Sequence, residues 1–193
     1  FQDKKVTFTI ILGIGIKIPE ACQNIDLNGR FPIFGTQGND SIHGTIKDDV
    51  IFSLEGNDRI FGGGGNDCII GGVGNDTLRG ETGNDILFGN EGNDTMMGGS
   101  GHDDISGGLD ADTIRGESGN DTLNGDEGND SMTGGSGNDV MNGGADNDTI
   151  DGESGNDSIH GNTGNDVLTG GSGADTLIGD ADTDKANGQS GVD

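Results

Sequence analysis

A nine-residue stretch, Gly71-Gly72-Val73-Gly74-Asn75-Asp76-Thr77-Leu78-Arg79, decides the fold of this chain because its pattern recurs without a break. Seventeen full units run from Gly35 to Asn187, and a partial unit continues to Asp193. Position 1 of the unit is Gly in every full unit except at Ser53, position 6 is always Asp, and position 8 is always apolar. An unbroken period of this length predicts a repeat architecture rather than one compact core.

The letters of one unit predict its local structure. Positions 1 to 6 are rich in Gly, Asn and Asp, which tolerate the positive φ angles of tight turns. Positions 7 to 9 predict a short strand with position 8 facing inward and positions 7 and 9 facing outward. Such short strands must stack in parallel to be stable, so two units form one coil of 18 residues. We therefore expect an all-β parallel roll of about nine coils over residues 35–193.

Composition alone indicates a different molecule. The chain has 42 Gly, 35 acidic residues against 9 basic ones, and a formal net charge of −26. High charge with little apolar mass is typical of disordered chains. The charge also disfavours nucleic acid as a partner, because the chain would repel phosphate. The sequence has no apolar run long enough for a transmembrane segment.

The recurring Asp at position 6 forms the candidate site. In a parallel stack, each edge of the roll would carry a ladder of carboxylates at the ~4.8 Å strand spacing. Carboxylates this close repel one another unless a divalent cation lies between them. Oxygen donors from carboxylates and turn carbonyls favour Ca²⁺ over softer metals. The candidate ligands are Asp40, Asp49, Asp58, Asp67, Asp76, Asp85, Asp94, Asp103, Asp112, Asp121, Asp130, Asp139, Asp148, Asp157, Asp166, Asp175, Asp184 and Asp193.

The units over residues 35–193 resemble the RTX (repeats-in-toxin) nonapeptide, Gly-Gly-x-Gly-x-Asp-x-apolar-x. The resemblance implies a right-handed parallel β-roll whose turns bind Ca²⁺ through the position-6 Asp and turn carbonyls. Nine turns on each edge would hold on the order of 16 Ca²⁺ ions. The resemblance also implies a chain that is disordered without Ca²⁺ and folds after export, so we expect a secreted, extracellular or cell-surface location.

Residues 1–34 form a separate N-terminal segment. Apolar residues alternate with others from Val6 to Ile18, before Pro19, which predicts a long strand that caps the roll or links subunits. The alternative is a signal peptide, since Lys4 and Lys5 precede the apolar run.

A patch of apolar residues is expected on one face of the roll, where three successive coils carry apolar outward positions. Its members are Val50, Phe52, Cys68, Ile70, Ile86 and Phe88. The N-terminal strand of the same chain, or that of a neighbouring subunit, would cover this patch. Because Cys22 follows the strand and Cys68 lies in the patch, we expect a Cys22–Cys68 disulfide, within one chain or between two. Two free thiols are the alternative.

The sequence contains no catalytic constellation, and its three His are dispersed, so we expect no enzyme. The favoured hypothesis is a secreted calcium-binding structural protein whose roll folds on Ca²⁺ and stacks end to end with copies of itself into a fibre or surface layer. One alternative is a Ca²⁺-triggered folding and export module of a larger toxin, protease or adhesin. Another is an ice- or glycan-binding protein that uses the hydroxyl ladder Thr77, Thr95, Thr113, Ser131 and Thr149.

Overall fold

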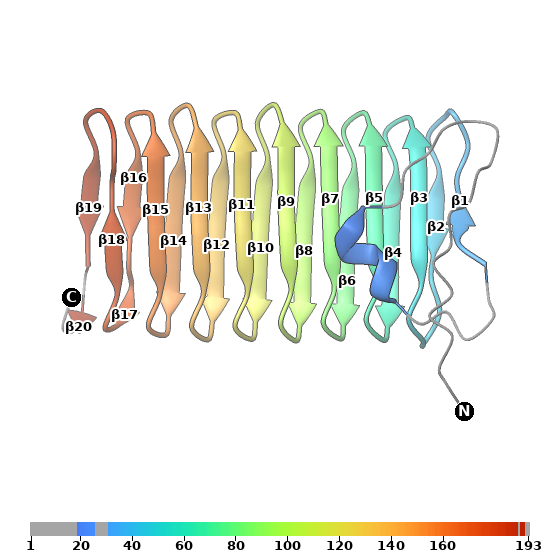
Figure 1. The fold of residues 1–193 in the computed structure, drawn as a ribbon, viewed down its shortest axis with the longest axis horizontal. Coiled ribbons are helices and arrows are strands. Elements are labelled where there is room, and N and C mark those ends of the chain that lie inside the picture. Colours follow the sequence, from blue (N-terminus) through green and yellow to red (C-terminus); the bar gives the residue numbers. More distant parts are fainter. Residues whose placement is uncertain (1–18, 26–30, 189, 192–193) are drawn as a thin grey trace.

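The fold is an elongated solenoid of parallel strands, shown by a computed structural model that describes residues 19–25, 31–188 and 190–191 (Figure 1). Each strand pairs in parallel with the strand one coil away, in a register offset of 18 residues, as in Leu78↔Met96. The predicted all-β parallel solenoid with coils of 18 residues is therefore confirmed. Its two sheets face each other along the whole length of the rod.

The first sheet has nine strands, which follow one another along the rod in chain order. They are β1 (Ile33–Phe34), β3 (Val50–Glu55), β5 (Cys68–Val73), β7 (Ile86–Glu91), β9 (Asp104–Leu109), β11 (Thr122–Glu127), β13 (Val140–Ala145), β15 (Ser158–Thr163) and β18 (Thr176–Ile178).

The second sheet has eleven strands, with β17 and β20 off its main path. They are β2 (Ser41–His43), β4 (Arg59–Gly64), β6 (Thr77–Thr82), β8 (Thr95–Ser100), β10 (Thr113–Ser118), β12 (Ser131–Ser136), β14 (Thr149–Ser154), β16 (Val167–Thr169), β17 (Ser172–Gly173), β19 (Lys185–Asn187) and β20 (Ser190–Gly191).

Most strands are twice as long as the three residues predicted from the repeat. In β5 the strand continues from Cys68, Ile69 and Ile70 into the first three residues of the next unit. Both Ile69 and Gly71 are buried, so positions 8 and 1 face inward and position 9 faces outward between them. The prediction of three-residue strands was wrong because it assigned every Gly to a turn.

The core is a single file of position-8 side chains between the two sheets. Each coil contributes two of them, so the interior is narrow, as the scarcity of large apolar residues requires. The file comprises Ile51, Ile60, Ile69, Leu78, Leu87, Met96, Ile105, Ile114, Leu123, Met132, Met141, Ile150, Ile159 and Leu168, none more than 1% exposed.

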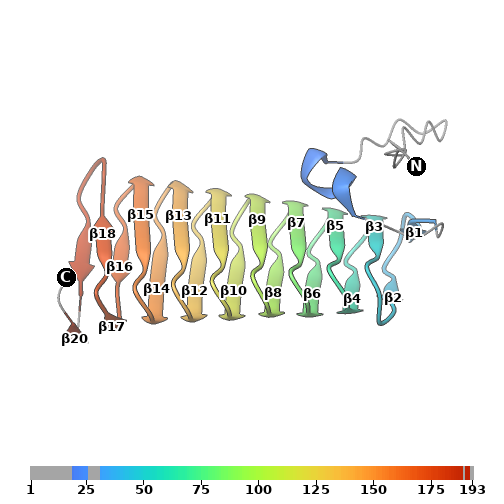
Figure 2. The same cartoon turned by 60° about the horizontal axis from the view of Figure 1, so that its bottom comes forward.

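A short 3₁₀ helix, η1 (Glu20–Asn24), lies outside the first sheet over its early strands (Figure 2). Cys22 of η1 is joined to Cys68 of β5 by a disulfide within one chain, and both residues are buried. In the part of the chain that the structure describes, no helix is long and apolar enough to cross a membrane.

The predicted apolar patch is covered by η1 and the residue that follows it. Cys22, Val50, Phe52 and Cys68 form a buried cluster, against which Ile25, Leu54, Ile70, Ile86 and Phe88 pack. The N-terminal strand that we expected here falls within residues 1–18, outside the described residues. The Cys22–Cys68 link spans 46 residues, and closing a loop of this size is worth about 4 kcal/mol in the chain-entropy model.

A core substitution tests the single-file interior. Leu123 is fully buried, whereas Leu109 is 43% exposed. Leu123→Ala should lower the free energy of unfolding by about 2–5 kcal/mol, because its cavity has no second layer of side chains to fill it. The matched change Leu109→Ala should cost less than about 1 kcal/mol. Urea unfolding of both variants in saturating Ca²⁺ measures the difference, and equal losses would contradict the single-file core.

Candidate metal centre

The position-6 Asp residues form two ladders, one at each edge of the roll. Within a ladder the backbone N–H of one Asp donates to Oδ1 of the Asp one coil later, as from Asp76 to Asp94 at 2.7 Å and from Asp85 to Asp103 at 2.8 Å. The same bond recurs from Asp40 to Asp58 and onward to Asp166 and Asp184. These bonds orient each accepting carboxylate, from Asp58 to Asp184, in its turn.

The second carboxylate oxygen of most of these Asp residues is buried and has no hydrogen-bond partner. Leaving a buried carboxylate oxygen without a partner costs free energy, so each one indicates a missing cation or proton. Fourteen residues share this feature: Asp58, Asp67, Asp76, Asp85, Asp94, Asp103, Asp112, Asp121, Asp130, Asp139, Asp148, Asp157, Asp166 and Asp175.

From Gly62 onward, the glycine at position 1 packs directly against these oxygens, and a side chain there would clash with them. A Cβ added to Gly116 would lie 2.3 Å from Oδ2 of Asp121 and 2.6 Å from the carbonyl oxygen of Gly134 in the next coil. Gly125 has the same neighbours, Asp130 Oδ2 at 2.3 Å and the Gly143 carbonyl at 2.4 Å. The Oδ2 atom and a carbonyl oxygen of the next coil therefore lie close together beside the glycine, with no side chain between them. Carboxylate and carbonyl oxygens are the ligands that a hard cation such as Ca²⁺ prefers.

Burial shifts the ladder carboxyls strongly toward the protonated form. Desolvation, together with the charges of Asp112 and Asp76, raises the pKa of Asp94 to about 8, although the hydrogen bond from the Asp76 backbone lowers it. Desolvation likewise raises the pKa of Asp112 and of Asp148 to about 7. In a metal-free roll at neutral pH, ionised ladder carboxylates would therefore destabilise the folded state.

The donor chemistry is that of an oxygen site. Among the residues described, no three His, Cys, Asp or Glu side chains converge on one point, so a bound ion would need backbone carbonyls as well as carboxylates. The three His residues make separate contacts. His43 stacks on Phe61 at 4.7 Å between centroids, His102 Nδ1 accepts a hydrogen bond from the Asn120 N–H at 2.8 Å, and His160 Nδ1 lies 3.3 Å from Asp180 Oδ2.

The ends of the ladders differ from the middle. Oδ2 of Asp40 accepts hydrogen bonds from the backbone N–H and hydroxyl of Thr36, at 2.6 and 2.9 Å. Oδ2 of Asp49 accepts the corresponding bonds from Thr45, at 2.7 and 2.8 Å. Asp184 is half-buried, and the predicted ligand Asp193 lies outside the described residues.

Position 5 carries a further kind of ladder, made of Asn side chains, which was not predicted from the sequence. The Oδ1 atom of Asn57 accepts the N–H of Asn75 at 2.9 Å, and Asn75 does the same for Asn93. In this Asn ladder, each side-chain oxygen accepts the N–H of the residue one coil later. The direction is reversed in the Asp ladders, where each carboxylate accepts the N–H of the residue one coil earlier. The signal was present in the sequence, since Asn occupies position 5 in most units.

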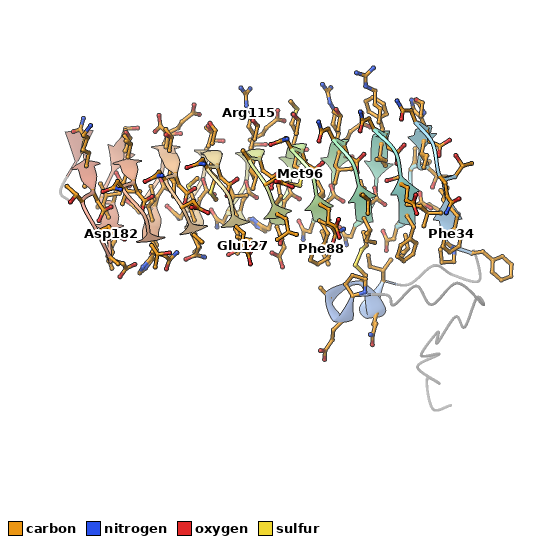
Figure 3. All side chains as sticks on the ribbon, turned by 90° about the horizontal axis from the view of Figure 1, so that it is seen from above. Phe34, Phe88, Met96, Arg115, Glu127 and Asp182 are labelled. Atoms are coloured by element: carbon orange, nitrogen blue, oxygen red, sulfur yellow. A yellow bond between two sulfur atoms is a disulfide. The ribbon has the colours of Figure 1, made fainter. Side chains whose placement is uncertain are left out.

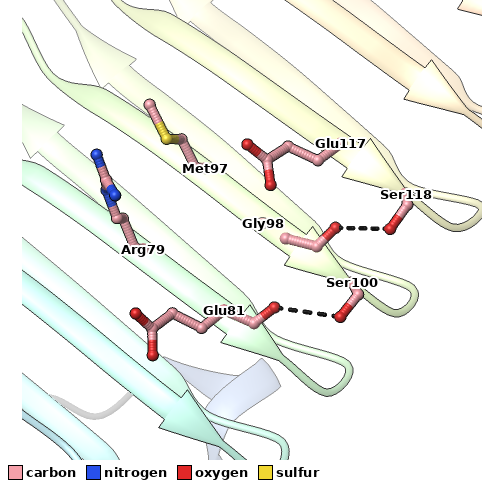
Figure 4. Close-up of a pocket in the computed structure, with 8 residues that line it drawn as sticks. Arg79, Glu81, Met97, Gly98, Ser100, Glu117 and Ser118 are labelled. Carbon is pink, nitrogen blue, oxygen red and sulfur yellow. Dashed lines mark hydrogen bonds between the residues drawn. The ribbon is translucent and has the colours of Figure 1, made fainter.

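A shallow hollow of about 230 Å³ lies on the outer face of the second sheet, lined by Arg79, Glu81, Met97 and Glu117 among others (Figure 4). Its Ser100 and Ser118 hydroxyls donate to carbonyls of the preceding coil, at 3.4 and 3.2 Å.

The predicted hydroxyl ladder lies on the same sheet. Thr95 and Thr113 occupy neighbouring strands in register, and Thr77 and Ser131 extend the row on either side. The exposed Arg115 belongs to this face and projects from it (Figure 3). A flat face of hydroxyls, as ice binding would need, is therefore interrupted by long side chains.

The raised pKa values predict how the metal-free chain responds to pH. In the folded state, the pKa of ladder carboxyls lies at about 6 to 8, above the ordinary 3.8. The folded state therefore binds protons more tightly than the unfolded state does. Protonation stabilises the fold fully below pH 3.8, and this contribution is lost as the pH rises through 6 to 8. Far-UV circular dichroism of metal-stripped protein should show β-structure growing from pH 8 to pH 5. A β signal that falls or stays constant on acidification would contradict this.

Comparison with known families agrees with this geometry. None of the curated proteins compared with the chain matches it. The family model described as the RTX calcium-binding nonapeptide repeat (4 copies) matches at residues 34–69, 70–105, 97–132, 106–141, 124–159, 133–168 and 160–193. These matches together cover residues 34–193 without a gap, and repeats of this family bind Ca²⁺ in a β-roll. The chain therefore belongs to the RTX calcium-binding nonapeptide repeat family.

Proposed function

We propose that this chain is a calcium-dependent structural module whose roll folds when Ca²⁺ occupies both Asp ladders. The observation that carries the proposal is the set of fourteen buried Oδ2 atoms without a partner. Each ion would take a position-6 carboxylate from Asp58 to Asp175 together with carbonyl oxygens of the turns. About one ion for each such oxygen gives on the order of 14 ions.

Charge explains why the ion would control folding. The chain carries −26 overall, and its ladder carboxylates lie one coil apart inside turns that exclude water. Without cations, their mutual repulsion and desolvation oppose folding. On the order of 14 Ca²⁺ would supply about 28 positive charges and remove both penalties.

We propose an extracellular or cell-surface location. The support is the buried Cys22–Cys68 disulfide, since disulfides persist in oxidising compartments. A chain that needs many Ca²⁺ ions to fold also suits surroundings with abundant Ca²⁺ and not the low-Ca²⁺ cell interior. We assign it no catalytic role.

We also propose that folded rods stack end to end into a fibre or surface layer, with copies of this chain as partners. The support lies in the terminal strands of each sheet. β18 and β19 each have a sheet neighbour on one side only among the described strands. At this end Leu177 is half-buried and Ala186 is exposed, although both occupy the inward position 8. An unpaired strand edge with apolar groups beside it is a template for further pairing.

A pair of single-charge variants tests calcium binding. Asp112 is buried in a ladder, whereas Asp104, at position 7 of its repeat unit and first in β9, is exposed. Asp112→Asn should raise the Ca²⁺ concentration at the folding midpoint by on the order of tenfold, because one ion loses its carboxylate ligand. Asp104→Asn removes the same charge and should leave the midpoint nearly unchanged. Circular dichroism during Ca²⁺ titration measures both, and equal shifts would contradict a specific ligand role.

Electron microscopy tests the stacking. Purified chain in millimolar Ca²⁺ should form filaments about as wide as one roll, and chelation should disperse them because the stacked coils unfold. Single dispersed rods at high protein concentration in Ca²⁺ would rule out end-to-end assembly while leaving calcium binding intact.

A further inference from the structure

The first three repeat units differ from later ones in carrying a hydroxyl residue at position 1 or 2, namely Thr36, Thr45 and Ser53. In the first two units, the hydroxyls of Thr36 and Thr45 donate to the Oδ2 atoms of Asp40 and Asp49, at 2.9 and 2.8 Å. In the third, Ser53 replaces the position-1 Gly, and its buried hydroxyl donates to the Gly71 carbonyl of the next coil. From Gly62 onward position 1 is always Gly. In the first two units a hydroxyl therefore partners the Oδ2 atom that has no partner from Asp58 to Asp175.

The same end of the rod has a larger apolar core than the rest. Strand β3 is buried on both faces over Val50, Ile51, Phe52 and Ser53, whereas later strands alternate between buried and more exposed positions. The additional burial comes from η1, which the Cys22–Cys68 disulfide holds against the sheet. Neither contribution depends on a metal ion.

Aromatic stacking adds a third contribution that needs no ion. Phe34 of β1 stacks on Phe52 of β3 at 5.2 Å between ring centroids. On the opposite sheet His43 stacks on Phe61 at 4.7 Å, and the guanidinium of Arg79 lies 5.8 Å from the Phe61 ring centre. All seven Phe of the chain precede residue 89.

We propose that residues 31–61, covered by η1, which the Cys22–Cys68 disulfide anchors to the neighbouring strand β5, form a template that folds without Ca²⁺ and on which the calcium-dependent coils add from the N-terminal end toward the C-terminal end. The template presents β3 and β4 as preformed edges to β5 and β6, which spares the first calcium-dependent coil the cost of nucleation. Asp58, the first Asp with an unpartnered Oδ2, lies at its boundary.

This inference rests on the proposed calcium-dependent folding, and hydrogen exchange separates the two. In metal-free buffer with the disulfide intact, amides of residues 31–61 should exchange at least about tenfold more slowly than those of residues 76–175. Uniformly fast exchange that Ca²⁺ reverses would overturn the template alone. Uniformly slow exchange without metal would overturn the proposed function itself.

Matched variants test what stabilises the template. Thr45→Val should speed metal-free exchange in residues 31–61, because the Asp49 carboxylate loses its hydroxyl donor. The control Thr82→Val removes a hydroxyl that donates to the Gly63 carbonyl outside the template and should leave that exchange unchanged. The double substitution Cys22→Ser with Cys68→Ser should also speed metal-free exchange in residues 31–61. If neither Thr45→Val nor the loss of the disulfide changed metal-free exchange in residues 31–61, the proposed template would be contradicted.

Two substitutions in the middle of the rod, called the block below, test the direction in which coils add to the template. Asp112→Asn with Asp121→Asn removes one ladder carboxylate at each edge, and each accepts an N–H bond from the preceding coil. At a Ca²⁺ concentration just sufficient for the parent chain, exchange should stay slow before the block and become fast after it. Loss of protection before the block, or equal loss on both sides, would overturn growth from the N-terminal template.

Discussion

The buried carboxylate ladder is the constraint on which the rest of this structure depends. Each coil brings two Asp side chains into the turns and pins one oxygen of each to the backbone of the preceding coil. The other oxygen is left in a dry space beside a glycine. Such an arrangement is unstable for a bare carboxylate at neutral pH, and the raised pKa values of residues such as Asp94 express that instability. A cation makes the same geometry favourable, so the ion serves the role that a large apolar core has in other domains.

The turns also explain a longer period of 36 residues in the sequence, over which position 2 repeats. Along one edge, position 2 alternates between Glu81 or Glu117, at φ of 76° and 75°, and Gly99 or Gly135, at 114° and 109°. A Cβ on Gly99 would lie 2.2 Å from the Glu81 carbonyl oxygen, so a side chain fits on every second coil only. Two coils of alternating turn geometry therefore form the true structural repeat.

Much of the architecture could be predicted from the repeat, because each position has one environment in every coil. The inward position 8, the register of 18 residues and the two Asp ladders all follow from the period. The length of the strands could not be predicted in this way. Gly71 and its equivalents lie in strands, and they are Gly because a side chain there would clash with Asp76. Residue propensities do not reveal such a contact between turn and strand. The hydroxyl donors Thr36 and Thr45 were likewise hidden, since their role depends on which oxygen faces them.

The N-terminal cover shows a different limit. The apolar outward positions on three successive coils predicted that something must cover them, yet the pattern of residues 6–18 suggested a strand. Among the described residues the cover is η1, whose Cys22 and Ile25 complete the cluster around Cys68. A short helix fixed by a disulfide has no periodicity in the sequence, so pattern reasoning located the covered surface but not the element that covers it.

The most direct test of this account is the number of Ca²⁺ ions bound per folded chain, measured by equilibrium dialysis and elemental emission alongside far-UV circular dichroism. We expect about 14 ions per chain at saturation and a loss of most β-structure in parallel with their removal. A β-roll that keeps its full circular dichroism signal at neutral pH with no bound divalent cation would contradict it.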